Sequence, residues 1–281
     1  MDSVGKLLSG VKVVSLAINT PGPVAAARLA SMGAEVIKVE PPTGDPLRTV
    51  APAWYQSLSC GQTVLTLDLK TTDGRRQLET HLAGADLLVA SFRPSALRRL
   101  ELDWESVHQR HPRLCLAGII GYPPPLEERS GHDLTYLASA GLLSPPQLPL
   151  SLYVDLAGAE RCVTAALALL LHFSRTQQAG YEFVSLYDCA CELAAPWKAG
   201  LTRREGVLGG GYPLYSMYQA SDAWIAVAAL EPHFAQRLLA ELGLTQADRA
   251  KLEQIFRGRS AAAWEQWAGE RGLPLAAVRE K

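Results

Sequence analysis

Apolar and polar positions follow two alternating patterns through the first two thirds of the chain. Short apolar runs typical of buried strands are separated by stretches in which apolar residues recur at helical spacing. The expected strands occupy residues 11–17, 34–40, 63–69, 86–91, 113–119 and 183–186, and the expected helices residues 24–32, 72–82, 104–109, 158–174 and 188–200, with a short helix after Pro94. This order predicts an α/β fold with a mostly parallel sheet covered by helices on both faces.

The pattern changes near residue 204. The polar stretch 202–205 is followed by three consecutive glycines, residues 209–211, and such a stretch indicates a domain boundary. We therefore expect a large domain of residues 1–204 and a smaller α+β domain of residues 205–281. The elements expected in the small domain are strands at 213–219 and 224–229 and helices at 232–242, 245–256 and 260–271. The glycines are interpreted as a hinge or tight turn, with a loop that contacts substrate as the alternative.

Charge and hydropathy exclude several classes of protein. The 281 residues include 27 Lys and Arg against 28 Asp and Glu, a balance of 27 − 28 = −1, and no block of like charge is five residues long. The longest apolar run, residues 163–173, is too short for a transmembrane helix, which needs about 20 residues. We therefore expect neither nucleic acid nor a membrane among the partners.

Metal and nucleotide motifs are missing from the sequence. The five cysteines are odd in number and none stand in C-x-x-C spacing, so we expect reduced thiols in a cytoplasmic protein. The histidines lack metal spacing, and no metal site is expected. No G-x-G-x-x-G follows the first strand, and neither a phosphate loop nor a G-x-S-x-G elbow occurs.

Residues 130–137 place a His-Asp pair directly before an apolar helix. Asp133 is expected to cap that helix through its carboxylate. His132 then lies at the positive end of the helix dipole, which favours a neutral imidazole. A neutral imidazole near pH 7 is suited to general base catalysis. The alternative is that the pair is a helix cap and nothing more.

Several blocks in order along the chain resemble the family III CoA-transferases, the CaiB/BaiF family. They are Gly22-Pro23, residues 29–40, 44–46, 67–70, 85–88, 92–94 and 111–114. The blocks 131–137, 209–215 and 226–232 are most similar to the α-methylacyl-CoA racemase branch of that family. The resemblance implies a Rossmann-like large domain, a smaller domain and a dimer of interlocked rings.

The resemblance also implies an active site. Its aspartate matches Asp155, its histidine His132 and its supporting glutamate Glu231, which stand 155 − 132 = 23 and 231 − 155 = 76 residues apart. In racemases of the family, the imidazole and the carboxyl group exchange a proton at the carbon next to a thioester. In the transferases, the aspartate attacks the thioester instead. For Asp155 and Glu231, helix capping is the alternative role.

The expected substrate is an acyl-CoA, with coenzyme A as part of the substrate and no permanently bound cofactor. Three basic positions of the family pattern are changed here, at Pro41, at residues 61–62 and at residues 177–178. The expected contacts to CoA are Arg48, Arg93, Arg175 and Tyr215. Each lost charged contact costs about 1.5–3 kcal/mol, so we expect weakened CoA binding.

Relative to the family, the resemblance implies a chain that is short at its C-terminal end, beyond residues 273–278. We therefore expect either a homodimer or a complex with a different partner chain, bound at an uncovered part of the large domain. Three functions stay open. They are racemase-like proton exchange at the α-carbon of a 2-methylacyl-CoA, CoA transfer between carboxylic acids, and a non-catalytic accessory role.

Overall fold

A computed structural model describes residues 7–279 of the chain. The chain forms two compact units, the first ending at Leu193 and the second beginning at Ala194. The boundary therefore lies earlier than the expected one after Arg204. Residues 194–204 fold against the segment that follows them, because the N–H of Leu208 donates to the carbonyl of Leu201 at 3.0 Å.

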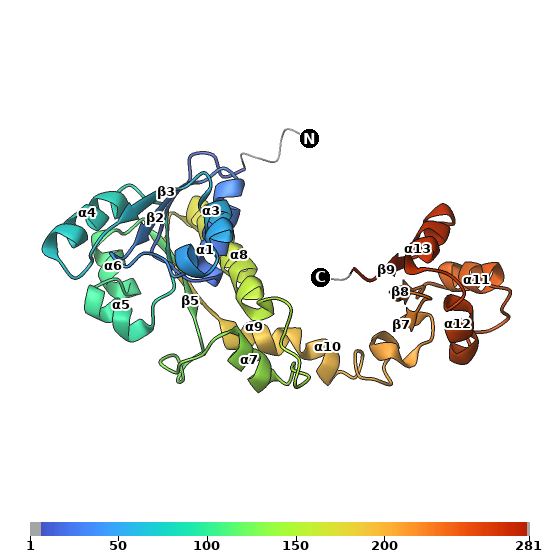
Figure 1. The fold of residues 1–281 in the computed structure, drawn as a ribbon. Helices are drawn as coiled ribbons and strands as arrows, with labels where there is room; N and C mark the ends of the chain where they lie inside the picture. The colour runs from blue at the N-terminus through green and yellow to red at the C-terminus, as the bar shows by residue number, and fades with distance from the viewer. Residues whose placement is uncertain (1–6, 280–281) are drawn as a thin grey trace. The chain divides into compact units, whose positions relative to one another are not determined.

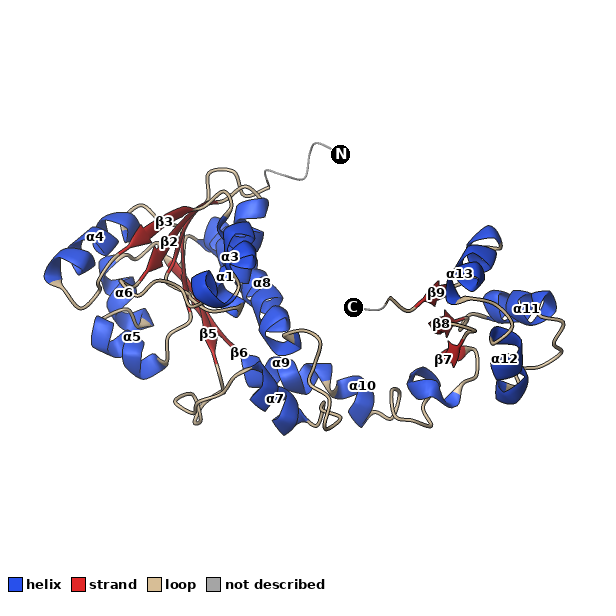
Figure 2. Ribbon diagram, viewed as in Figure 1, coloured by secondary structure: helices blue, strands red, loops and turns tan. Residues whose placement is uncertain are grey.

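The first unit contains a sheet of parallel strands (Figure 2), and their order is β3-β2-β1-β4-β5-β6. The strands are β1 Lys12–Ser15, β2 Glu35–Glu40, β3 Thr63–Thr66, β4 Leu87–Ala90, β5 Cys115–Ile120 and β6 Tyr181–Ser185. All six correspond to strands expected from the apolar runs. The order reverses direction between β1 and β4, which is the arrangement of a doubly wound, Rossmann-like sheet.

Helices cover both faces of this sheet (Figure 1). The helices of this unit are α1 Pro21–Ser31, α2 Leu47–Val50, α3 Pro52–Ser59, α4 Thr72–Leu82, α5 Pro94–Leu100, α6 Trp104–Arg110, α7 Asp133–Ala140, α8 Tyr153–Thr176 and α9 Leu186–Leu193. On one face, Leu82, Leu97 and Val107 of α4, α5 and α6 pack with strand residues in one buried cluster. On the other face α1 and α8 pack against each other and against the strands. The expected α/β architecture of the large domain is thus confirmed.

The second unit is small and has its own core. Its elements are α10 Ala195–Lys198, the π-helical turn η1 Val207–Gly211, β7 Tyr215–Gln219, β8 Trp224–Ala228, α11 Pro232–Glu241, α12 Arg249–Phe256, α13 Ala261–Glu270 and β9 Leu275–Ala277. The strands form an antiparallel sheet in the order β7-β8-β9, of which β9 was not expected. Phe256 and Trp264 are buried at its centre. Gly210 has φ = +104°, so the glycines form a tight turn.

Gly22 allows α1 to approach the end of β1 closely. A Cβ atom at this position would lie 2.1 Å from the Cβ of Ala17, which is fully buried. We expect Gly22→Ala to lower the free energy of unfolding by about 1–3 kcal/mol, the cost typical of overpacking. Urea denaturation measures this, with Gly84→Ala as the control, because a Cβ there meets nothing within 4 Å. Equal midpoints for the two variants would contradict the prediction.

Candidate active site

His132 and Asp155 line the same cavity in the first unit. The cavity has a volume of about 240 Å³ and lies at the carboxyl ends of β1, β4 and β5. Its wall includes Asn19 after β1 and Ser91 after β4, and the Ser91 hydroxyl accepts the N–H of Ile18 at 3.3 Å. This is the point where the strand order reverses, the usual ligand position in an open α/β sheet. Folding therefore brings together two residues that the sequence separates.

Asp155 lies in the first turn of α8, where its carboxyl group is half-buried. Burial, and after it the negative charge of Asp133, raise its pKa to about 7, although the side chain of Thr20 acts in the opposite direction. A carboxyl group with this pKa is present in both protonation states at neutral pH, as an acid/base group requires. Asp155 is inside the helix, so the alternative role as a cap before residue 158 is wrong.

Asp133 caps a different helix from the one expected. Its Oδ1 accepts the N–H groups of Val154 at 2.7 Å and Asp155 at 3.0 Å, which belong to the first turn of α8. Asp133 as a whole is 5% exposed. His132 is the N-cap residue of α7, and its N–H donates to the Thr135 hydroxyl at 2.9 Å. The expectation that Asp133 caps α7 is therefore corrected, because the buried carboxylate is used across the α7–α8 contact.

One of the expected arginines, Arg93, lines the cavity. Its guanidinium donates to the Ser130 hydroxyl at 2.8 Å. Arg48 lies on α2 beside Glu40, 3.5 Å between Nη1 and Oε2. Arg175 is in the last turn of α8, 175 − 155 = 20 residues beyond Asp155, a rise of about 30 Å along the helix. Arg175 is therefore far from the cavity.

The other two expected site residues belong to the second unit. Tyr215 is the first residue of β7. Glu231 occupies the N-cap position of α11 but makes no capping hydrogen bond with its side chain. Their roles stay predictions.

Three side chains of the cavity wall were not expected from the sequence, those of Glu127, Arg129 and Tyr136. Burial raises the pKa of Tyr136 to about 12, so its hydroxyl stays protonated and can donate. Arg129 stacks over the ring of Tyr122 at 4.7 Å. The Oε2 atom of Glu127 is buried and has no hydrogen-bond partner among the described residues 7–279. Of the three, Tyr136 could have been expected at the site from the sequence, because it belongs to the block 131–137 that resembles the family.

A second cavity of about 390 Å³ lies at the carboxyl ends of β1, β2 and β3 and shares Ile18 with the first. Its wall is mostly apolar and includes Pro41 and Phe92, with Lys70 as a cation. Such a crevice suits a flat apolar ring, and Lys70 suits an attached phosphate. The changed position Pro41 thus lies in the wall of this apolar crevice.

A buried ion cluster holds the loop between β1 and α1. Lys38 Nζ lies 2.8 Å from Glu40 Oε1 and 2.6 Å from Asp45 Oδ2, and all three side chains are at most 1% exposed. Asp45 Oδ1 also accepts the N–H of Asn19 at 3.2 Å, and Asn19 has φ = +68°. The cluster therefore fixes a strained loop residue at the wall of the first cavity.

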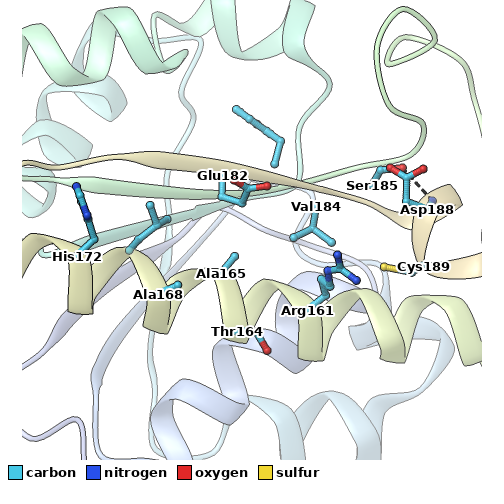
Figure 3. A pocket seen from close by; sticks show the side chains of 12 residues that line it. Arg161, Thr164, Ala165, Ala168, His172, Glu182, Val184, Ser185, Asp188 and Cys189 are labelled. Atoms are coloured by element: carbon cyan, nitrogen blue, oxygen red, sulfur yellow. Dashed lines mark hydrogen bonds between the residues drawn. The ribbon is translucent and has the colours of Figure 1, made fainter. Parts of the chain in front are cut away.

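A larger cavity, of about 520 Å³, lies between α8 and the edge strand β6 (Figure 3). Four consecutive residues of β6, 182–185, line it, so it runs along the free edge of the sheet and not across the carboxyl ends of the strands. Arg161 at its wall pairs with Glu192, and Ser185 accepts the N–H of Asp188 at 3.1 Å. Because it lies away from the carboxyl ends of the strands, it is a weaker candidate for an active site.

The described residues contain neither a membrane-spanning helix nor a cluster of metal ligands. Within residues 7–279, no helix is long and apolar enough to cross a membrane. In the same range, no group of three or more His, Cys, Asp or Glu side chains is arranged to hold a metal ion.

Comparisons with known proteins give consistent matches. The model of CoA-transferase family III matches residues 8–281. The chain is 31% identical over 292 residues to alpha-methylacyl-CoA racemase of Mus musculus, covering 92% of this chain and 74% of that one. It is 36% identical over 157 residues to cinnamoyl-CoA:phenyllactate CoA-transferase of Clostridium sporogenes, covering 51% and 38%. The crystal structure of a hypothetical protein from Mycobacterium tuberculosis is similar with a TM-score of 0.85 and 28% identity, covering 98% of this chain and 84% of that one.

Proposed function

The chain belongs to CoA-transferase family III, and on that premise we propose that it acts on acyl-CoA thioesters and exchanges the proton on the α-carbon of a 2-methylacyl-CoA. The observation that carries this proposal is the shared cavity. An imidazole, from His132, and a carboxyl group with a pKa of about 7, from Asp155, line it together. A carboxyl group poised in this way is suited to removing and returning a proton near neutral pH.

In the proposed reaction one of these side chains removes the α-proton, and the electron pair of the C–H bond passes into a thioester enolate. The other side chain then delivers a proton to the opposite face of the carbon. The enolate oxygen needs oriented donors. The first-turn N–H groups of α7 begin beside His132, and their direction along the helix dipole favours a negative charge there.

Binding of the CoA part is expected at the apolar crevice and the cations beside it. Arg93 and Arg129 line the first cavity, and Lys70 lines the second. Arg48 lies on α2, which follows the crevice segment 40–43. These residues supply cations for phosphate groups, so the changed positions of the family pattern weaken CoA binding in this proposal without removing its site.

His132→Ala is expected to lower the rate at which the two enantiomers of 2-methylacyl-CoA interconvert by about 10²–10⁴-fold, because one of the two acid/base groups is lost. The measurement starts from each enantiomer in deuterated water and follows the chirality and the deuterium content of the α-carbon. His172→Ala is the control, since His172 lies near the C-terminal end of α8 and lines the separate cavity between α8 and β6. Interconversion at the wild-type rate in His132→Ala would rule out the two-base reaction.

The second candidate is CoA transfer, favoured by the relatives that are named CoA-transferases. Here the Asp155 carboxylate attacks the thioester carbonyl, the C–S bond breaks, and CoA leaves as the thiolate. Hydroxylamine added with acyl-CoA would convert the resulting anhydride into a hydroxamate on Asp155. Such an adduct, found by mass spectrometry, would replace the racemase-like reaction with CoA transfer.

The assembly is part of the same proposal, either a homodimer or a complex with a different chain. The loop before α8 supports a partner surface, because Leu148 and Leu150 on it are 71% and 72% exposed. Light scattering of the purified protein measures the assembly. A monomer at all concentrations would contradict the homodimer.

A further inference from the structure

We propose that Asp133 is a positioning residue that fixes Asp155 in the cavity by holding the first turn of α8 against the start of α7. This inference rests on the proposed function, in which Asp155 is an acid/base group. Asp133 touches no substrate in it and acts through the two helices.

The geometry of the α7–α8 contact carries the proposal. The Asp133 Oδ1 atom accepts two N–H groups of another helix, those of Val154 at 2.7 Å and Asp155 at 3.0 Å. In the chain, Asp133 directly follows His132, the N-cap residue of α7. Asp133 is therefore linked to His132 by the peptide bond and to the backbone of Asp155 by a hydrogen bond from its buried carboxylate. A shift of either helix start breaks the hydrogen bonds to α8.

The charge of Asp133 has a second consequence for Asp155. The start of a helix is positive and by itself favours an ionised carboxylate. The Asp133 carboxylate occupies that positive end and repels a negative charge on Asp155. By occupying the helix start, the Asp133 carboxylate offsets the stabilisation that the helix dipole gives to ionised Asp155. This raises the pKa of Asp155, as burial does, and burial is the larger cause.

Other charged groups near this end of α8 come from several elements. The residues that line the cavity with Asp155 are Arg93 after β4, Glu127 and Arg129 in the loop after β5, and His132 and Tyr136 at α7. Further along α8, Arg28 of α1 pairs with Glu160, and Glu192 of α9 pairs with Arg161. Thr20 before α1 contributes an uncharged hydroxyl. Within the described residues 7–279, the backbone N–H of Asp155 donates to the Asp133 carboxylate and to none of these other side chains.

Two substitutions separate the charge of Asp133 from its hydrogen bonds. Asp133→Asn keeps an oxygen that can accept an N–H but removes the charge, whereas Asp133→Ala removes both. We expect the titration midpoint of the Asp155 carboxyl to fall in Asp133→Asn, from about 7 toward the ordinary aspartate value of about 3.9. The readout is carbon NMR of protein labelled at its aspartate carboxyls, with the Asp155 signal assigned from Asp155→Asn.

The activity of the two variants tests the positioning itself. We expect kcat to fall by about 10²-fold in Asp133→Ala, the cost of a small misplacement of a catalytic group. Asp133→Asn should recover part of that loss, with the pH–rate profile displaced toward acid. The matched control is Asp248→Asn, since Asp248 caps α12 in the second unit by accepting the N–H of Ala250 at 3.0 Å.

The outcomes distinguish this inference from the proposed function. An Asp155 midpoint unchanged in Asp133→Asn, with kcat of both Asp133 variants equal to that of Asp248→Asn, overturns the positioning role and leaves the function intact. A wild-type protein without acyl-CoA activity overturns the function. In that case the Asp155 titration, together with faster amide hydrogen exchange at Val154 and Asp155 in Asp133→Ala, still decides whether Asp133 holds the two helices.

Discussion

Replacing Asp155 with asparagine is expected to lower the rate at which the two enantiomers of 2-methylacyl-CoA interconvert by about 10²–10⁴-fold and to make the protein more stable. The rate falls because the amide neither accepts nor returns the proton. Stability rises because burial and the charge of Asp133 raise the pKa of Asp155 to about 7. The ionised carboxylate is thus held in a place that disfavours its charge, as is common at sites of catalysis.

The pH dependence gives the sign of the stability effect. The folded-state pKa of Asp155, about 7, is above the unfolded value of about 3.9. Between these values the folded protein binds more protons at Asp155 than the unfolded chain, so this group's contribution to stability falls as the pH rises. An asparagine side chain does not titrate in this range, so the variant does not lose stability in this way as the pH rises. We expect Asp155→Asn to be about 0.5–2 kcal/mol more stable at pH 8, with the difference disappearing near pH 4.

Urea denaturation at the two pH values and the interconversion assay in deuterated water measure both effects. Glu160→Gln is the matched control, because Glu160 lies on the same helix and its partner Arg28, 2.7 Å away, is exposed. That variant should keep the interconversion rate and the stability of the wild type. The prediction fails if Asp155→Asn retains more than about a tenth of the wild-type rate or loses stability at pH 8.

Local sequence patterns were sufficient for elements whose ends are set by neighbouring residues. The helix α4 occupies residues 72–82 as predicted, because the Thr71 hydroxyl accepts the N–H of Gly74 at 3.0 Å. In contrast, α8 begins at Tyr153, 158 − 153 = 5 residues before its predicted start. Its first turn is capped by Asp133 from another helix. The spacing of apolar residues along one helix contains no information about a cap that comes from a distant residue.

The candidate site was predictable by residue type but not by distance. The resemblance to the family selected His132 and Asp155, and they do share a cavity. Arg93 and Arg175 were selected for their charge, yet the length of α8 separates Arg175 from that cavity. Glu127 had no signal, because its place at the wall depends on how the loop after β5 folds. Residue type therefore identified candidates for the site, but which of them lie close together follows only from the folded structure.

Lys38→Met is expected to lower the free energy of unfolding by about 3–5 kcal/mol, the cost typical of breaking a buried ion pair. The substitution removes the cation shared by two carboxyl groups that are 0% exposed, and it leaves Glu40 with the exposed Arg48, 3.5 Å away, as its cation. Burial by itself raises the pKa of Glu40, and the hydrogen bonds from Lys38 and Tyr55 bring it below the ordinary value. Without Lys38 the pKa of Glu40 should rise, so the deficit should shrink as the pH falls.

Urea denaturation at pH 7.5 and pH 5 tests this, with Lys12→Met as the control, since Lys12 is an exposed lysine on the neighbouring strand β1. Adding Glu40→Gln and Asp45→Asn to Lys38→Met should restore much of the stability, because no uncompensated charge is then buried. The α-exchange rate of Lys38→Met should also fall, because Asp45 holds the N–H of Asn19 at the cavity wall. A Lys38→Met variant as stable as Lys12→Met at pH 7.5 would show that the ion cluster contributes no net stability.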